Sequence, residues 1–342
     1  QGLGLGGHFT GVTHDTASMA TFSAVLTMRE RATGGAANRE GVPRGLRIYA
    51  SAQNHSSVDK AVRMAGIGQE NLVRVATEPD WGMDPAALAA AIRADLAAGL
   101  HPAGVIACVG GTSIGATDPV AEIIRIAKEY GLPVHVDAAW AGAAMLCPEE
   151  RSAWAGIDGA DSIVVNPHKW LGVQFDCAVQ FLAEPAHQID ALAMRPEYLK
   201  TAGQEVVNYS EWVPQLGRPF RALKLWFVLR AYGLAGLREM IRNHLRWTRA
   251  LADAVAAEPD FELVTPAKFA LFTFRYHRPG TDPDTLTARL VEAINEDGRI
   301  YLTPTQHQGR QAIRFTVGQW DTEEADVLAA WDIIREIARN LP

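Results

Sequence analysis

The feature that most constrains the fold is an alternation, over residues 1–240, of short β-branched segments with longer segments of helical period. Five of the short segments have the length and composition of buried strands: 46–50, 104–109, 134–137, 162–165 and 177–182. Strands separated by helices pair mostly in one direction, because a helical crossover returns the chain to the same edge of the sheet. The sequence therefore predicts an α/β fold with a mostly parallel sheet and helices on both faces.

The pattern changes towards the C-terminus. Apolar helical segments occupy 220–232 and 234–258, and after residue 260 the order becomes strand, helix, strand, strand, helix. Those later strands are expected at 269–275, 300–303 and 312–317, with helices at 283–296 and 322–341. This order indicates a small α+β domain. We expect a large domain over 1–240 and a small C-terminal domain over 241–342.

Composition excludes several classes of protein. Of the 342 residues 48% are hydrophobic, and the net charge is −7, so neither a disordered chain nor a nucleic-acid-binding surface is expected. No apolar run is long enough to span a membrane, and the three cysteines have no disulfide spacing. We expect a cytoplasmic protein that binds neither nucleic acid nor membrane. The chain begins with Gln1 and a Gly-rich turn, so a preceding segment is expected to be missing.

Polar side chains follow the predicted strands at the points where the strands end. These residues are His55, Thr112, Asp137, Asn166, His168 and Lys169, and the first long helix begins at Thr16, Ala17 and Ser18. In open parallel sheets ligands bind at the carboxyl ends of the strands, so we expect these residues to converge. An anion site, a histidine, a carboxylate and a lysine at one edge suit a phosphorylated, pyridine-like cofactor that carries an aldehyde.

The helix start and Asp137 each allow two interpretations. Residues 16–18 offer free N–H groups and the positive end of a helix dipole, which a phosphate needs, but Ser and Thr are also ordinary N-caps. Asp137 can hold a protonated ring nitrogen, or it can cap a helix or join an ion pair in the core. Neither residue type decides the matter alone.

Lys169 and His55 are equally ambiguous when taken singly. Lys169 lies between a strand and Trp170, so we expect it to be partly buried, with a lowered pKa and a nucleophilic amine. Most lysines are solvated surface residues instead. His55 can stack on a cofactor ring or satisfy only its own loop. The order of these residues along one α/β chain is more specific than any one of them.

That order is found in a known family. The segments concerned are 55–57 (HSS), 135–142 (HVDAAWAG), 166–170 (NPHKW), 195–200 (RPEYLK) and 216–224 (LGRPFRALK). Over nearly the whole chain they resemble the group II pyridoxal-phosphate-dependent decarboxylases, and among these the aromatic-L-amino-acid decarboxylases. The resemblance implies a fold-type I enzyme with a seven-stranded-type sheet, and pyridoxal 5'-phosphate (PLP) as the cofactor.

The resemblance also implies a role for each candidate residue. Lys169 forms a Schiff base with the cofactor aldehyde, Asp137 pairs with the pyridine nitrogen, and His55 stacks on the ring. Tyr198 returns a proton to the substrate carbon after carbon dioxide leaves. The other cofactor contacts are Thr16, Ala17, Ser18, Asn166 and His168 at the phosphate, and Thr112 beside the ring hydroxyl.

The activity that the resemblance implies is decarboxylation of an aromatic L-amino acid by a PLP-dependent carboxy-lyase that forms a homodimer. Two alternatives stay open: an aldehyde-forming enzyme or a decarboxylase of a non-aromatic amino acid, and a non-catalytic dimerisation remnant. Retention of Lys169, Asp137, His55 and Tyr198 disfavours the remnant. Neither His-x3-His nor Cys-x2-Cys spacing occurs, so no metal site is expected.

The sequence departs from the family at the start of the first helix. Asp15 stands where relatives have Gly, and Met19 stands where they often have Glu. A carboxylate at position 15 repels a phosphate unless it points away as a cap. The family also has an N-terminal segment before the Gly-rich turn, which this chain does not contain.

Overall fold

The computed structural model describes residues 2–194 and 206–341. They form two compact units. The first comprises residues up to Val109 together with Thr117–Gly233, and the second comprises Gly110–Ala116 together with residues from Leu234 onward. The domain boundary that we expect at residue 240 lies within α7 (Ala222–Ala257). The two units divide after Gly233, where the backbone leaves helical geometry.

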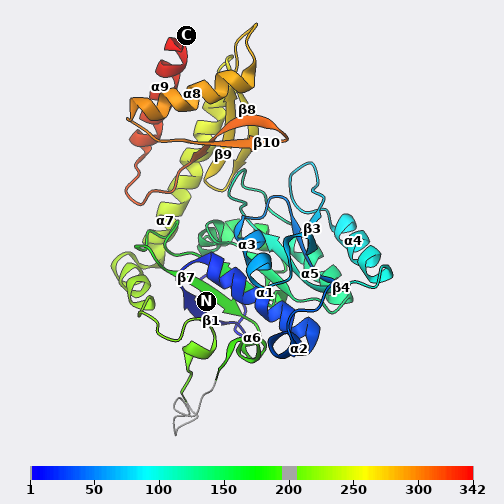
Figure 1. Ribbon diagram of the computed structural model, residues 1–342. Helices are drawn as coiled ribbons and strands as arrows, with labels where there is room; N and C mark the ends of the chain where they lie inside the picture. Colours follow the sequence, from blue (N-terminus) through cyan, green and yellow to red (C-terminus); the bar gives the residue numbers. More distant parts are fainter. Residues whose placement is uncertain (1, 195–205, 342) are drawn as a thin grey trace. The chain divides into compact units, whose positions relative to one another are not determined.

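The first unit is built on a seven-stranded sheet (Figure 1). In spatial order its strands are β1 (Thr10–His14), β7 (Ala178–Leu182), β6 (Ser162–Val165), β5 (Val134–Asp137), β4 (His101–Cys108), β2 (Leu46–Ser51) and β3 (Leu72–Val75). Strands β6, β5, β4, β2 and β3 pair in parallel. Only β7 runs against its two neighbours. The sheet is therefore mixed but mostly parallel, as the alternation of segments predicts.

Helices cover both faces of this sheet. They are α1 (Ala17–Thr33), α2 (Ala36–Glu40), α3 (Ser57–Met64), α4 (Pro85–Ala97), α5 (Val120–Glu129) and α6 (Pro185–Leu192). The crossover from β2 to β3 through α3 moves one way along the sheet, whereas those through α4 and α5 move the other way. Because such crossovers are right-handed, α4 and α5 cover the face opposite α3. Short 3-10 turns complete the unit: η1 (Gln69–Asn71), η2 (Ala141–Leu146), η3 (Pro148–Trp154), η4 (Ile157–Gly159) and η6 (Tyr209–Glu211).

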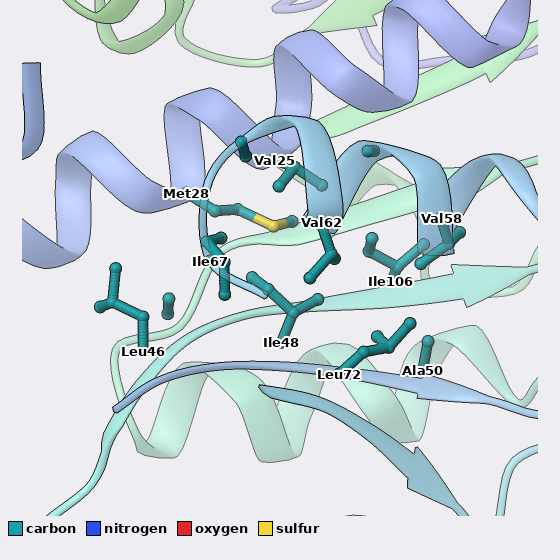
Figure 2. Close-up of a cluster of buried hydrophobic side chains, with 13 residues drawn as sticks. Val25, Met28, Leu46, Ile48, Ala50, Val58, Val62, Ile67, Leu72 and Ile106 are labelled. Carbon is teal, nitrogen blue, oxygen red and sulfur yellow. The ribbon is translucent and has the colours of Figure 1, made fainter. Parts of the chain in front are cut away.

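A buried apolar cluster fixes α1 and α3 to the sheet (Figure 2). Val25 and Met28 of α1 and Val58 and Val62 of α3 meet strand residues such as Ile48. Burial of such a side chain contributes about 1.5–3 kcal/mol, so the cluster is the main reason that these helices stay on this face. A Cβ added to Gly104 of β4 would lie 2.5 Å from the Met28 sulfur, so this close approach requires glycine.

The second unit contains a four-stranded antiparallel sheet and two helices. The strands are β10 (Thr303–His307), β11 (Arg310–Thr316), β9 (Leu271–Tyr276) and β8 (Phe261–Lys268) in spatial order, and the helices are α8 (Pro283–Asp297) and α9 (Glu324–Asn340). The Phe261 ring packs at a tilt against Phe274 and Tyr276 and edge-on against Trp331 in the core of this unit. This is the small α+β layer that the change in pattern predicts.

Several predicted elements are wrong in position or were missed. The strand expected at 300–303 is β10, which begins at Thr303 and lies at the edge of its sheet, where Pro304 and Gln306 are exposed. β1, β3 and β8 were not predicted, because they are short or only half-buried and so carry little apolar signal. By contrast, Gly233 has φ 65° and separates the two helical segments where the sequence divides them.

No helix within residues 2–194 or 206–341 combines the length and apolarity needed to cross a membrane. All three cysteines are buried.

Candidate active site

The sheet brings the ends of its strands to one edge. Asp137, the last residue of β5, lies opposite Cys108 at the end of β4. Val165 at the end of β6 pairs with Val179, and His14 at the end of β1 pairs with Ala178. Since β7 alone is reversed, the end of β1 and the start of α1 reach the same edge as the ends of the parallel strands. The predicted convergence of the residues after β5 and β6 with the start of α1 follows.

Asp137 is a buried carboxyl group with few partners. Only 8% of the residue is exposed. Its Oδ1 accepts a hydrogen bond from the Ala139 N–H at 3.0 Å, and no other donor or cation of the described chain contacts it. Burial of a charged group is stable only when the charge is paired, so this carboxyl group is placed to bind a cation from outside the described protein.

The start of α1 packs directly beside Asp137. Ala17 and Ala20 form a buried cluster with Ala139 and Val164. Thr16 is the N-cap, and its hydroxyl accepts the Met19 N–H at 3.4 Å. The N–H groups of Ala17 and Ser18 have no acceptor in the described chain, as expected for a first helical turn. Two free donors and the positive end of a 17-residue helix form an anion site at this edge.

Asn166 and His168 lie in the turn that follows β6. Asn166 is buried, its N–H donates to the Ala139 carbonyl at 2.8 Å, and its side-chain Oδ1 has no partner in the described chain. His168 is half-buried, and its Nδ1 accepts the Cys177 N–H at 2.8 Å. Burial and the neighbouring Lys169 charge lower the pKa of His168. The ring is therefore neutral near pH 7, with its proton on Nε2, where it can donate to an anion.

Lys169 follows His168 in the same turn. Its N–H donates to the Asn166 carbonyl, and its carbonyl accepts from Gly172. The expectation that its side chain is partly buried is wrong, because the chain leaves the sheet here and gives the buried position to Trp170. The Lys169 side chain is exposed at the edge where Asp137 and the start of α1 meet.

His55 lies in the turn between β2 and α3. Its side chain is exposed, and its Nδ1 accepts the Ser57 N–H at 3.1 Å. This contact leaves Nε2 as the protonated nitrogen of the neutral ring. Thr112 is exposed in the 110–116 loop, which belongs to the second unit, and Tyr198 lies outside the described residues. The functional roles predicted for Thr112 and Tyr198 stay predictions.

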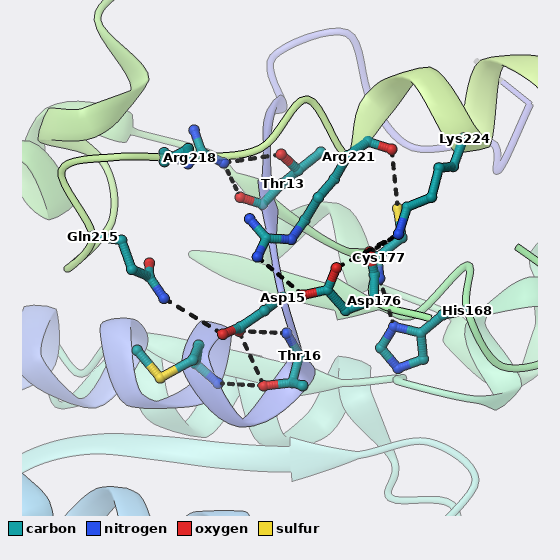
Figure 3. A network of polar contacts seen from close by, with 11 residues as sticks. Thr13, Asp15, Thr16, His168, Asp176, Cys177, Gln215, Arg218, Arg221 and Lys224 are labelled. Atoms are coloured by element: carbon teal, nitrogen blue, oxygen red, sulfur yellow. Dashed lines mark hydrogen bonds and ion pairs between the residues drawn. The ribbon is translucent and has the colours of Figure 1, made fainter. Parts of the chain in front are cut away.

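Sequence reasoning missed a polar network on the β1 side of the edge (Figure 3). Asp176 accepts from Arg221 Nη2 at 3.0 Å and lies 3.5 Å from Lys224 Nζ. Arg218 donates to the carbonyl and hydroxyl of Thr13. The signal was present in the basic residues of the 216–224 segment. Their partners Asp176 and Thr13 lie at least 40 residues away in the chain, so spacing could not reveal these pairings.

These observations fit PLP. The helix start supplies free N–H donors for a phosphate, and the single-donor carboxyl group of Asp137 can accept a protonated ring nitrogen. Asn166 adds a buried amide whose NH₂ group can donate to a phosphate oxygen. An exposed lysine lies in the turn next to both.

Comparison with known proteins agrees with this fit. Residues 4–277 match the model of the "Pyridoxal-dependent decarboxylase conserved domain". The chain is 39% identical to a tryptophan decarboxylase of Camptotheca acuminata, over 99% of this chain and 69% of that protein. The chain spans 59 to 69% of the length of the first curated relatives that it matches.

Solved structures are similar as well. The crystal structure of an Oryza sativa TDC with PLP and tryptamine superimposes with a TM-score of 0.93 at 37% identity, covering 98% of this chain and 71% of the other. The 4-hydroxyphenylacetaldehyde synthase of Rhodiola rosea superimposes with a TM-score of 0.91 at 34% identity, covering 99% and 73%. One fold thus serves both amine-forming and aldehyde-forming relatives.

Proposed function

The chain belongs to the pyridoxal-dependent decarboxylases, and from that premise we propose that it removes the α-carboxyl group of an aromatic L-amino acid, releasing the amine and carbon dioxide. The observation that carries the proposal is the buried Asp137 carboxyl group, which has one donor and no cation in the described chain, beside the open helix start and Lys169. PLP, when bound, supplies a protonated pyridine ring that accepts the electron pair left by carbon dioxide.

The residues at this edge of the sheet then have separate roles. Asp137 keeps a proton on the ring nitrogen by accepting its hydrogen bond. Lys169 supplies the amine that holds the cofactor covalently until substrate replaces it. The remaining residues hold the phosphate or face the ring: Thr16, Ala17, Ser18, Asn166 and His168 at the phosphate, and His55 and Thr112 at the ring.

Proton return to the substrate carbon is assigned to Tyr198, on the resemblance alone. His55 is the second candidate donor, because its Nδ1 accepts the Ser57 N–H and its Nε2 carries the proton. The presence of both side chains favours the amine over the aldehyde as the product.

The side chain of the substrate is proposed to be an indole or a phenol. The first curated relatives act on tryptophan or tyrosine by their names. Gly217 precedes Arg218 in the segment near the start of α1, and a Cβ placed there would meet no atom within 4 Å. This open space supports the proposal of a bulky substrate side chain if the substrate lies beside Gly217.

We also propose that the protein is a cytoplasmic homodimer. The first part of α7 exposes Leu223, Trp226, Phe227 and Tyr232 to solvent. An exposed apolar helix face of this kind is typical of a surface that a second subunit covers. We further propose the division into two domains at residue 240, which the change in the sequence pattern predicts.

The test is to incubate the purified chain with PLP and with Trp, Tyr, Phe, DOPA or Glu, and to measure carbon dioxide, amine, aldehyde and peroxide together. We expect equal amounts of amine and carbon dioxide from at least one aromatic substrate, without peroxide. Aldehyde with peroxide indicates the aldehyde-forming alternative. A chain that shows no yellow colour with PLP, and no label after borohydride, is the non-catalytic remnant.

A further inference from the structure

The residue that precedes the N-cap of α1 is engaged with the N-cap itself. Asp15 Oδ1 accepts the Thr16 N–H at 2.6 Å and the Thr16 hydroxyl at 3.2 Å. Its Oδ2 accepts from Gln215 Nε2 at 3.5 Å (Figure 3). The Asp15 side chain therefore does not point away as the cap of α1. Its carboxylate bonds the N-cap residue instead, at the helix end where the phosphate is proposed to bind.

Two consequences follow for any anion at this site. A hydroxyl has one proton, so Thr16 can donate either to Asp15 or to a phosphate oxygen, but not to both. The Asp15 charge also lies at the helix end whose dipole attracts the anion, and like charges repel over this range.

No ion pair neutralises that charge in the described chain. Arg218 is committed to the carbonyl and hydroxyl of Thr13. Arg221 is committed to Asp176 at 3.0 Å. The nearest histidine, His14, is buried, and its pKa is lowered to about 4, first because of burial, so it is uncharged near neutral pH.

We propose that Asp15 is an internal competitor of the cofactor phosphate: its carboxylate occupies Thr16 and weakens the binding of phosphate esters at the start of α1. The inference rests on the proposed function. It assigns to this residue a specific effect on the affinity for PLP, separate from the covalent chemistry at Lys169.

The experiment measures dissociation constants rather than turnover. Chain stripped of cofactor is titrated with PLP, with inorganic phosphate and with pyridoxal, which lacks the phosphate. The variants are Asp15→Asn, which keeps the acceptor and removes the charge, and Asp15→Gly, which removes both. The matched control is Asp59→Asn, a carboxylate in the first turn of α3 that pairs with Arg74.

We expect both Asp15 variants to bind PLP and phosphate about tenfold more tightly than the unaltered chain, and to bind pyridoxal within about twofold of it. The gain should shrink in 0.5 M salt, because screening weakens the repulsion. The control should leave all three affinities unchanged.

Unchanged or weaker binding of PLP and phosphate by Asp15→Asn overturns the inference, and so does an equal gain for pyridoxal. These results are distinct from failure of the proposed function. If PLP binds and borohydride fixes it to Lys169 in every variant with equal affinity, only the role of Asp15 is wrong. If no variant is labelled by borohydride, the proposed function is wrong, and the phosphate titration still decides the role of Asp15.

Discussion

Two buried aspartates beside the ends of the neighbouring strands β4 and β5 have opposite surroundings. Asp118, before α5, accepts the Met83 N–H and the Cys108 N–H, each at 2.7 Å, and is 1% exposed. Asp137 lies opposite Cys108 on the next strand, is 8% exposed, and accepts one hydrogen bond in the described chain, from the Ala139 N–H. Both carboxylate oxygens of Asp118 thus accept backbone hydrogen bonds, whereas one carboxylate oxygen of Asp137 has no donor in the described chain.

The difference separates a structural carboxyl group from a chemical one. At Asp118 each carboxylate oxygen accepts a hydrogen bond from a buried N–H. These two hydrogen bonds hold the end of β4 beside the loop before α4. At Asp137 an oxygen is available for an incoming cation, and the fold bears the cost of burying it. We expect substitution of Asp137 or of Lys169 at the same edge to remove activity, and substitution of Asp118 to lower the free energy of unfolding.

The largest effect is expected from Lys169→Ala. Borohydride labelling by PLP should fall to zero, because the amine that forms the covalent bond is gone. Mass spectrometry of the reduced protein measures the label. The control is Lys60→Ala, an exposed lysine on α3. Full labelling of the Lys169 variant would place the covalent attachment at another lysine, and the role proposed for Lys169 would then be wrong.

Asp137→Asn should lower the rate of amine formation by about 10²–10³-fold, as is typical when one aimed electrostatic contact is lost. Asn keeps an acceptor for the Ala139 N–H and carries no charge for burial to penalise. The variant without cofactor should therefore unfold in urea at a concentration no lower than the unaltered chain. A large loss of stability with unchanged kinetics would contradict the distinction drawn between the two aspartates.

Asp118→Asn is the reciprocal change. The amide can accept one of the two N–H groups through its oxygen, and its NH₂ faces the other, so one buried donor loses its partner. A loss of about 1–3 kcal/mol in the free energy of unfolding is expected, measured by urea denaturation beside Asp137→Asn. The rate per molecule of folded enzyme should change little. Equal stability of the two Asn variants would show that the saturated contacts of Asp118 contribute nothing.

The smallest effect concerns Asp176, a carboxylate that is paired with cations and only partly buried. The hydrogen bond from Arg221 lowers the pKa of Asp176 below 3.8. Because the folded pKa is the lower one, the contribution to stability is present above the unfolded value and is lost as the pH falls through the folded value. Asp176→Asn should cost at most about 1 kcal/mol at pH 7, and the difference should disappear once the pH falls below the folded pKa of Asp176. A difference that grows with acidity would reverse the assigned direction.

Much of the candidate site could be predicted from the sequence, since it depends on strand order alone. Asp137, Asn166 and His168 were expected at one edge because each follows a buried apolar strand, and β5 and β6 have the bounds that the pattern predicts. The exposure of Lys169 was not predicted, because the direction of a side chain in a turn depends on which neighbour the core accepts. Here the core accepts Trp170.

What the sequence determined by itself was the alternation of strands and helices, the division of the long helical segment at Gly233, and the residue types at the ends of the strands. These are local properties, set by periodicity and by the backbone freedom of glycine. Only the tertiary structure decided which of those polar groups are satisfied. Asp118 and Asp137 are the same residue type and lie beside the ends of neighbouring strands, yet their hydrogen bonds depend on segments up to 35 residues apart in the chain. Satisfaction of a buried polar group depends on where distant backbone N–H groups come to lie, and that position exists only once the sheet has formed.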